Sequence, residues 1–213
     1  AGEPAAAMAL GGLLSYLYET QKTDLSHIRE LDYYRQGRFM ELDLASRRNL
    51  ELTETLRGKE KKGSLLWVLD KTKTPMGARM LRGWLERPLL SVTDIDRRSG
   101  AVAALVNDTI RREELIAGMT GLGDMERLIG RIVYGTAGGR DMVSLRAAIE
   151  KLPNLKEQLS AFSDRRLTEL TEAMDTLDDI GGDIAATVCD EPPFSVREGG
   201  IIRDGCNEEV DRL

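Results

Sequence analysis

Apolar residues recur every three or four positions along most of the chain, a spacing that places them on one face of an α-helix. The first run covers residues 5–22, where four leucines form a single stripe: Leu10, Leu13, Leu14 and Leu17. The same period predicts further helices, in chain order, over 44–56, 65–69, 75–87, 92–106, 109–119, 125–132, 142–152, 166–174 and 177–188. One more helical pattern occupies residues 207–213.

Short polar side chains stand before most of these runs, where they can accept hydrogen bonds from the first free amides of a helix. The expected caps are, in order, Asp43 or Ser46, Ser64, Ser91, Asp108 or Thr109, Asp124 and Asp141. Proline marks other boundaries: Pro75 suits the first turn of a helix, whereas Pro88, Pro153 and the pair at 192–193 are expected to interrupt one.

Extended segments are few and short. Residues 39–43 read as an extended segment, and residues 199–205 predict a tight turn with a short extended piece. No stretch of alternating apolar and polar residues is long enough for a sheet, and no internal repeat is evident. The sequence therefore predicts an all-α fold of short, irregularly packed helices with a minor short β element.

Composition narrows the class of protein. With 213 residues, of which 41% are hydrophobic and 31% charged, the chain can bury a core and is neither disordered nor a membrane protein. Cys189 and Cys206 are too few for a disulfide framework or a four-ligand zinc site, so we expect unpaired thiols in a reducing cytoplasm. His27 is the single histidine, which leaves little room for histidine-based catalysis. The missing initiator methionine and the helical pattern at the last residues lead us to expect a piece of a longer protein.

Charge is unevenly distributed. Residues 57–87 contain nine Lys and Arg against three Asp and Glu, a net charge of +6, whereas residues 154–213 contain six against fifteen, a net charge of −9. The basic segment fits either contact with a nucleic-acid backbone or a solvated helix face. The acidic total of −6 excludes a protein that is simply a basic coat for DNA.

Other candidate motifs have ordinary structural explanations. The glycine clusters at 118–123 and 135–139 lack the Gly-Lys-Ser/Thr ending of a phosphate loop, and neither follows a predicted strand, so we expect turns between helices. Adjacent carboxylates such as Asp178 and Asp179 are expected on solvated faces. The residues by themselves indicate an all-α module without a visible catalytic site.

Four segments carry a resemblance to a known family. Residues 42–52 read LDLASRRNLEL, where the family has L-D-x-x-[ST]-R-R-N-L-E-[LI]. Residues 64–89 follow the pattern S-L-x-x-x-L-D-x-T-x-T-x-M-G-x-R-x-L-x-x-W-L-x-x-P-L. DMERL at 124–128 and GGIIRDG at 199–205 are similar to D-[LI]-E-R-L and G-G-x-I-x-x-G. The chain thus resembles the MutS family of bacterial DNA mismatch-repair proteins over essentially its whole length.

The resemblance implies three parts. Residues 1–24 would be the C-terminal helix of a connector domain, residues 25–196 a helical core or lever domain, and residues 197–213 a turn and the start of a long lever helix toward a DNA clamp. The family's mismatch-reading G-x-F-x-E motif and its ATPase domain lie in other domains. Phe39 and Glu41 fall where the family has a short hydrophobic strand, so we interpret their likeness to that motif as coincidence.

The implied function is structural coupling between the ATPase, connector and DNA-clamp domains during mismatch repair. The longer protein would be a homodimeric ATPase that binds mismatched double-stranded DNA, ATP and magnesium, and works with a downstream factor such as MutL. This piece would contain no catalytic, cofactor or metal site and would not be an enzyme itself. Residues expected to fix helix ends and helix contacts are Asn49, Asp70, Thr72, Thr74, Arg79 and Arg82, with Trp84 in the core.

Three alternatives stay open. The first is a helical module that binds DNA directly through the segment 57–87, with Lys59, Lys61 and Lys62 as candidate contacts to the DNA backbone. The second is an enzyme whose site the sequence does not reveal. The third is membership of the paralogous branch of the family, which acts outside mismatch repair. The match at 42–52 favours the mismatch-repair branch instead.

Overall fold

The computed structural model describes residues 4–21, 25, 28, 37, 39–207, 209, 211 and 212. The chain divides into two compact units, residues 1–36 and 37–213. The described helices are α1 (Pro4–Gln21), α2 (Leu44–Asn49), α3 (Leu65–Leu69), α4 (Pro75–Glu86), α5 (Val92–Asn107), α6 (Thr109–Met119), α7 (Met125–Val133), α8 (Gly139–Ile149), α9 (Leu152–Ser160), α10 (Arg165–Ala173), α11 (Asp178–Thr187) and the short 3-10 helix η1 (Val196–Glu198).

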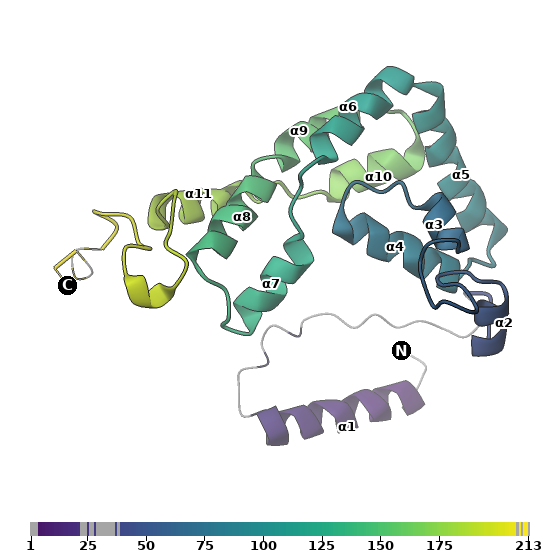
Figure 1. Cartoon of the computed structure of the whole chain (residues 1–213), viewed down its shortest axis with the longest axis horizontal. Coiled ribbons are helices and arrows are strands. Elements are labelled where there is room, and N and C mark those ends of the chain that lie inside the picture. Colours follow the sequence, from purple (N-terminus) through teal and green to yellow (C-terminus); the bar gives the residue numbers. More distant parts are fainter. Residues whose placement is uncertain are drawn as a thin grey trace. The chain divides into compact units, whose positions relative to one another are not determined.

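The first unit contains helix α1, shown in purple in Figure 1. Its bounds confirm the helix expected over residues 5–22 to within one residue at each end. Of its leucine stripe, Leu13 is exposed and the other three members are half-buried. His27 lies outside the described residues.

Side-chain caps set the beginnings of most helices in the second unit. The carboxylate of Asp43 accepts a hydrogen bond from the Ser46 amide at 2.6 Å, and Ser64 Oγ accepts one from the Trp67 amide at 3.2 Å. Ser91 and Asp108 cap α5 and α6 in the same way. Each cap satisfies an amide that has no partner inside the helix, which confirms the expected starting points of these helices.

Three predicted boundaries were wrong. Helix α2 ends at Asn49, not at residue 56, because Glu51 adopts a left-handed backbone (φ 47°) and accepts a hydrogen bond from the Leu65 amide. Helix α8 starts from Gly138, and Asp141 sits one turn inside it, where its carboxylate accepts the Gly138 amide at 2.9 Å. The helix expected over 142–152 ends at Ile149, and Pro153 lies in the first turn of a further helix, α9, which the pattern did not predict and where a missing amide proton costs nothing.

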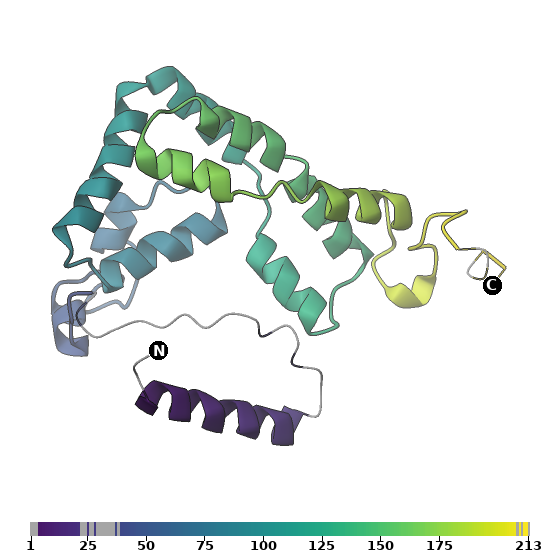
Figure 2. The same cartoon turned by 180° about the vertical axis from the view of Figure 1, so that it is seen from behind.

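Four helices enclose the larger hydrophobic core. Helix α5 contacts α6, α6 contacts α9, α9 contacts α10, and α10 returns to α5. Figures 1 and 2 show this group from opposite sides, with α9 and α10 side by side in both views. The buried residues at its centre are Ala101, Leu115, Leu155, Phe162 and Leu167.

A second core lies between α7, α8 and α11. Leu145 and Ile149 of α8 pack against Ile184 and the following Val188, with Met125 and Leu128 of α7 at the edge. Helix α11 approaches α8 closely: a Cβ atom added to Gly181 would lie 3.0 Å from Cγ2 of Ile149. Because α8 also contacts α9, this helix joins the two cores.

The β content of the described chain consists of isolated bridges. Phe39 pairs with Leu89, and Val188 pairs with Ile202, both antiparallel. The predicted all-α fold with a minor β element is therefore confirmed. The helix expected over 207–213 falls partly outside the described residues, and Glu209, Asp211 and Arg212 lie in turns.

Candidate functional site

Arg79 joins two helices that are far apart in the sequence. Its guanidinium, from the middle of α4, donates hydrogen bonds at 2.7 and 2.8 Å to the two carboxylate oxygens of Asp124, the residue that caps α7. Nε donates a third hydrogen bond, 3.0 Å long, to Oε2 of Glu126, which Nη2 also contacts. These hydrogen bonds raise the pKa of Arg79 and lower that of Asp124 to about 2. We call this group the Arg79 clamp.

Asp70 organises the connection between α3 and α4. Its carboxylate accepts hydrogen bonds from the amide and hydroxyl of Thr72, at 3.2 and 2.6 Å, and from Nζ of Lys61. The hydrogen bond from Lys61 is the main cause that lowers the pKa of Asp70 to about 2, and the Thr72 hydroxyl adds to it. Thr74 then caps α4 by accepting the Gly77 amide at 3.1 Å.

The remaining predicted residues have smaller roles. Arg82 donates to Glu86 within the same helix at 2.9 Å, which supports α4 but joins it to no other described element. The side chain of Asn49 is exposed and forms no hydrogen bond within the described part of the chain, contrary to expectation.

Trp84 does not lie in the core. Its side chain is 44% exposed, and the guanidinium carbon of Arg98 lies 3.9 Å from the centre of its ring. The helical period placed Trp84 on the apolar face of α4 correctly. However, α4 contains no fully buried residue, and the guanidinium of Arg98 lies over the ring of Trp84 in a cation–π contact.

The basic loop between α2 and α3 presents its lysines to solvent. Lys59, Lys61 and Lys62 are all exposed, and Lys59 adopts a left-handed backbone (φ 50°). Lys61 is engaged with Asp70, whereas the ammonium groups of Lys59 and Lys62 form no ion pair among the described residues. These two lysines are therefore available for an anionic partner.

Sequence reasoning missed a second cluster of charges. Asp190 accepts hydrogen bonds from Arg146 of α8 at 2.9 Å and from Arg203 at 3.1 Å, and this arrangement lowers its pKa. Arg146 is 44 residues away from Asp190 in the sequence, and Arg203 is 13 residues away from it. No local pattern reveals such pairs, because only the fold brings them together.

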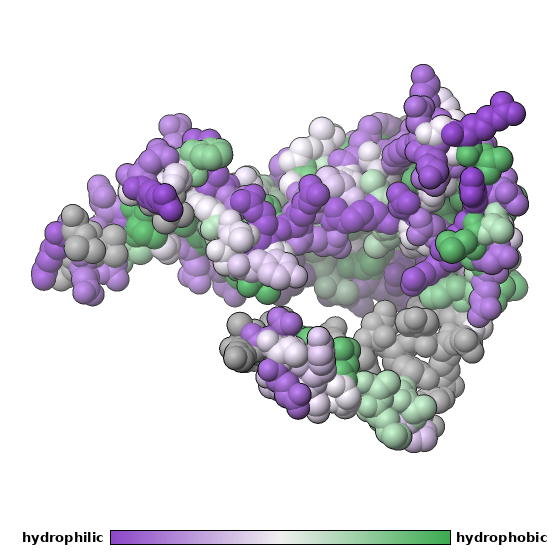
Figure 3. Space-filling view, turned by 60° about the horizontal axis from the view of Figure 1, so that its bottom comes forward, coloured by the Kyte–Doolittle hydropathy of each residue, from purple (hydrophilic) through white to green (hydrophobic). Residues whose placement is uncertain are grey.

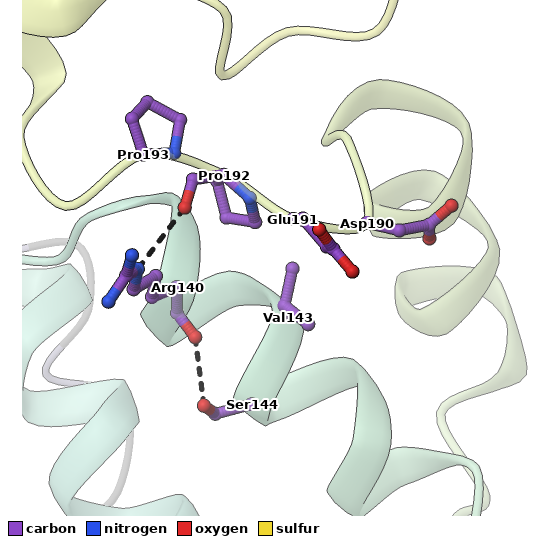
Figure 4. Close-up of a pocket in the computed structure, with 7 residues that line it drawn as sticks. All are labelled: Arg140, Val143, Ser144, Asp190, Glu191, Pro192 and Pro193. Atoms are coloured by element: carbon purple, nitrogen blue, oxygen red, sulfur yellow. Dashed lines mark hydrogen bonds between the residues drawn. The ribbon is translucent and has the colours of Figure 1, made fainter.

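A pocket of about 510 Å³ opens beside this cluster. Figure 4 shows Pro192 and Pro193 crossing above α8, where Nε of Arg140 donates to the carbonyl of Pro192 at 3.1 Å. Asp190 and Glu191 contribute carboxylates to the lining, and Ser144 directs its hydroxyl to the Arg140 carbonyl at 2.8 Å. The serine hydroxyl thus donates within its own helix and forms no hydrogen bond to a carboxylate of the described lining.

The two glycine clusters form connections between helices, as expected. Residues 120–124 link α6 to α7, and residues 134–138 link α7 to α8. Both cysteines are free thiols, as expected. Within the described ranges, no group of three or more His, Cys, Asp or Glu side chains could hold a metal ion. None of the described helices is long and apolar enough to cross a membrane.

Comparison with known proteins supports the resemblance found in the motifs. The family model described as MutS domain III matches residues 45–212. Proteins named DNA mismatch repair protein MutS are similar: that of Alkaliphilus oremlandii is 48% identical over 96% of this chain and 23% of its own length, and that of Desulforamulus reducens is 46% identical over 99% and 24%. A third, from Lachnoclostridium phytofermentans, is 47% identical over 96% of this chain and 22% of its own length.

This chain therefore spans about a quarter of the length of the curated relatives that it matches. The match covers α3 to α11, and with them the Arg79 clamp, the Asp70 connection and both hydrophobic cores. On this evidence the chain belongs to the MutS domain III family.

Proposed function

We propose that this chain is a rigid coupling element of a DNA mismatch-repair protein and transmits movement between domains attached to it. The observation that carries the proposal is the Arg79 clamp, in which one side chain of α4 holds the capping residue of α7. A bidentate arginine–carboxylate pair fixes the relative orientation of its partners as well as their distance. Helices held in this way move as a body, so a displacement at one end reaches the other.

The parts of the chain suggest where coupling would occur. Residues 1–24 would end a connector domain, residues 25–196 would form the core, and residues 197–213 would lead into a lever helix. The longer protein would be a homodimeric ATPase that binds mismatched double-stranded DNA, ATP and magnesium, with MutL as a downstream partner. The names of the relatives and the match to domain III support this assignment.

Coupling can be tested in the longer MutS-family protein that contains this chain. Mismatched DNA is expected to change the ATP turnover rate of this protein. In the Arg79→Ala variant, we expect this change to be about fivefold smaller, a typical size for the loss of a coupling contact. Turnover without DNA should stay unchanged. Arg82→Ala is the matched control, because its ion pair lies within one helix. A full mismatch response in the Arg79→Ala protein would exclude the clamp as part of the coupling route.

Direct DNA binding is the second candidate function, and the exposed Lys59 and Lys62 favour it. Fluorescence anisotropy of matched and G·T-mismatched duplexes, titrated with this chain at low and physiological salt, separates the two functions. A coupling scaffold should bind both duplexes weakly and with equal affinity, and this binding should disappear as the salt concentration rises. Tight binding that prefers the mismatch, and that Lys59→Gln with Lys62→Gln abolishes, would favour a DNA-reading module instead.

A further inference from the structure

A pocket separate from the Arg79 clamp lies between the α7–α8 connection and the residues around η1. Its volume is about 530 Å³, within the range of pockets that hold small ligands. Side chains that line it include those of Arg131, Thr136, Arg140, Asp141, Phe194 and Arg197.

Among the residues that the structure describes, two of the three arginines form no ion pair with an acidic side chain. Asp141 is occupied, because it accepts hydrogen bonds from Arg131 at 2.7 Å and from the Gly138 amide at 2.9 Å. Arg140 donates Nε to a carbonyl, and the guanidinium of Arg197 forms no ion pair within the described part of the chain. The pocket thus presents two guanidinium groups outside any ion pair of the described residues, while the neighbouring carboxylate of Glu198 accepts the Ser195 amide at 3.0 Å.

The lining of this pocket also includes an aromatic ring, that of Phe194. Phe194 is 84% exposed, and its ring centre lies 5.4 Å from the guanidinium carbon of Arg140. The segment that carries it is anchored, since Pro192 is buried and a Cβ atom on Gly139 would lie only 2.7 Å from Cβ of Pro192. The ring is therefore held out to solvent by a fixed backbone.

We propose that this pocket binds a nucleoside monophosphate, either free or as the terminal nucleotide of a single DNA strand. Guanidinium groups bind phosphate oxygens in pairs, so Arg140 and Arg197 would hold the phosphate. Every nucleobase has a face that stacks on an aromatic ring, so Phe194 would hold the base. Long duplexes fit poorly, because residues 154–213 carry a net charge of −9. The proposal is independent of the coupling function.

Titration of the isotope-labelled chain, followed by NMR, tests the site with five probes: dAMP, deoxyadenosine, inorganic phosphate, and oligothymidylate with and without a 5′-phosphate. We expect dAMP to shift the amides of Gly135, Gly138 and Ser195, and to bind more tightly than deoxyadenosine or phosphate alone. Preference for the 5′-phosphorylated strand over dAMP would identify a strand end as the ligand, and the reverse would identify a free nucleotide.

Variants connect binding to the proposed residues. Arg197→Gln should weaken dAMP binding by about tenfold, the usual effect of losing a hydrogen bond to a charged group. Phe194→Leu should weaken dAMP binding about as much and leave phosphate binding unchanged. Arg57→Gln removes the same charge from a distant loop and should have no effect. Equal losses in the Arg197→Gln and Arg57→Gln variants, or no shifts at millimolar dAMP, would each overturn the proposal.

Discussion

Arg79 and Asp124 form a bidentate pair across 45 positions of the sequence, and the same carboxylate caps helix α7 by accepting the Arg127 amide at 3.3 Å. One side chain therefore performs two tasks. It satisfies the first turn of α7, and it joins that turn to α4. The end of one helix is thereby fixed by a residue in the middle of another, which is the basis of the coupling function proposed above.

The two tasks of Asp124 can be separated by substitution. Asp124→Asn keeps an oxygen that can cap α7 but loses the ion pair, whereas Asp124→Ala loses both. We expect Asp124→Ala to destabilise the fold by about 0.5–2 kcal/mol, the usual cost of a lost cap, and Asp124→Asn by less. Urea unfolding of both variants measures the difference. If the two variants unfold alike, the cap contributes nothing beyond the pair with Arg79.

Acid should destabilise the protein through Asp70 and Asp124. Both pKa values are about 2 in the folded protein against 3.8 for the free side chain. A carboxyl group whose pKa is lower in the folded protein than in the unfolded chain stabilises the fold. This stabilisation is fully present at pH values above the pKa of the unfolded chain, and it is lost as the pH falls through the pKa of the folded protein. The free energy of unfolding should therefore decline between about pH 4 and pH 2. Urea titrations over this interval should show a smaller decline for Asp124→Asn than for the unaltered chain.

Local patterns predicted most of the described helices but not α9, and they predicted the contacts between helices poorly. Ser64, Thr74 and Asp124 act within three residues of the amides that they bind, so their spacing reveals their roles. The helical run does break before Pro153, but the pattern did not reveal α9, because proline is compatible with the first turn of a helix as well as with its end. Arg146 and Asp190 are brought together only by the fold, so no window of sequence could pair them.

The sequence pattern also failed to predict the burial of Trp84, and the contribution of this residue to stability can be measured. Phe162 is only 7% exposed at the centre of the α5, α6, α9 and α10 group, so Phe162→Ala should cost about 3–5 kcal/mol. Trp84→Ala should cost clearly less, because almost half of its side chain is already exposed. Chemical unfolding of the two variants compares them. A Trp84→Ala cost equal to that of Phe162→Ala would mean that Trp84 is a core residue after all.

Close packing at Gly139 should make this position intolerant of any side chain. A Cβ atom there would lie 2.7 Å from Cβ of Pro192 and 2.9 Å from Cγ2 of Ile201, so alanine must displace the chain that crosses α8. We expect Gly139→Ala to destabilise the fold by about 1–3 kcal/mol, as overpacking does. Gly182 in α11 is the control, because a Cβ atom there meets nothing within 4 Å. Gly182→Ala should stabilise the fold by about 0.5–1 kcal/mol through its helix propensity. Urea unfolding of the two variants should therefore shift in opposite directions, and a stabilising Gly139→Ala would show that residues 192 and 201 do not press against α8.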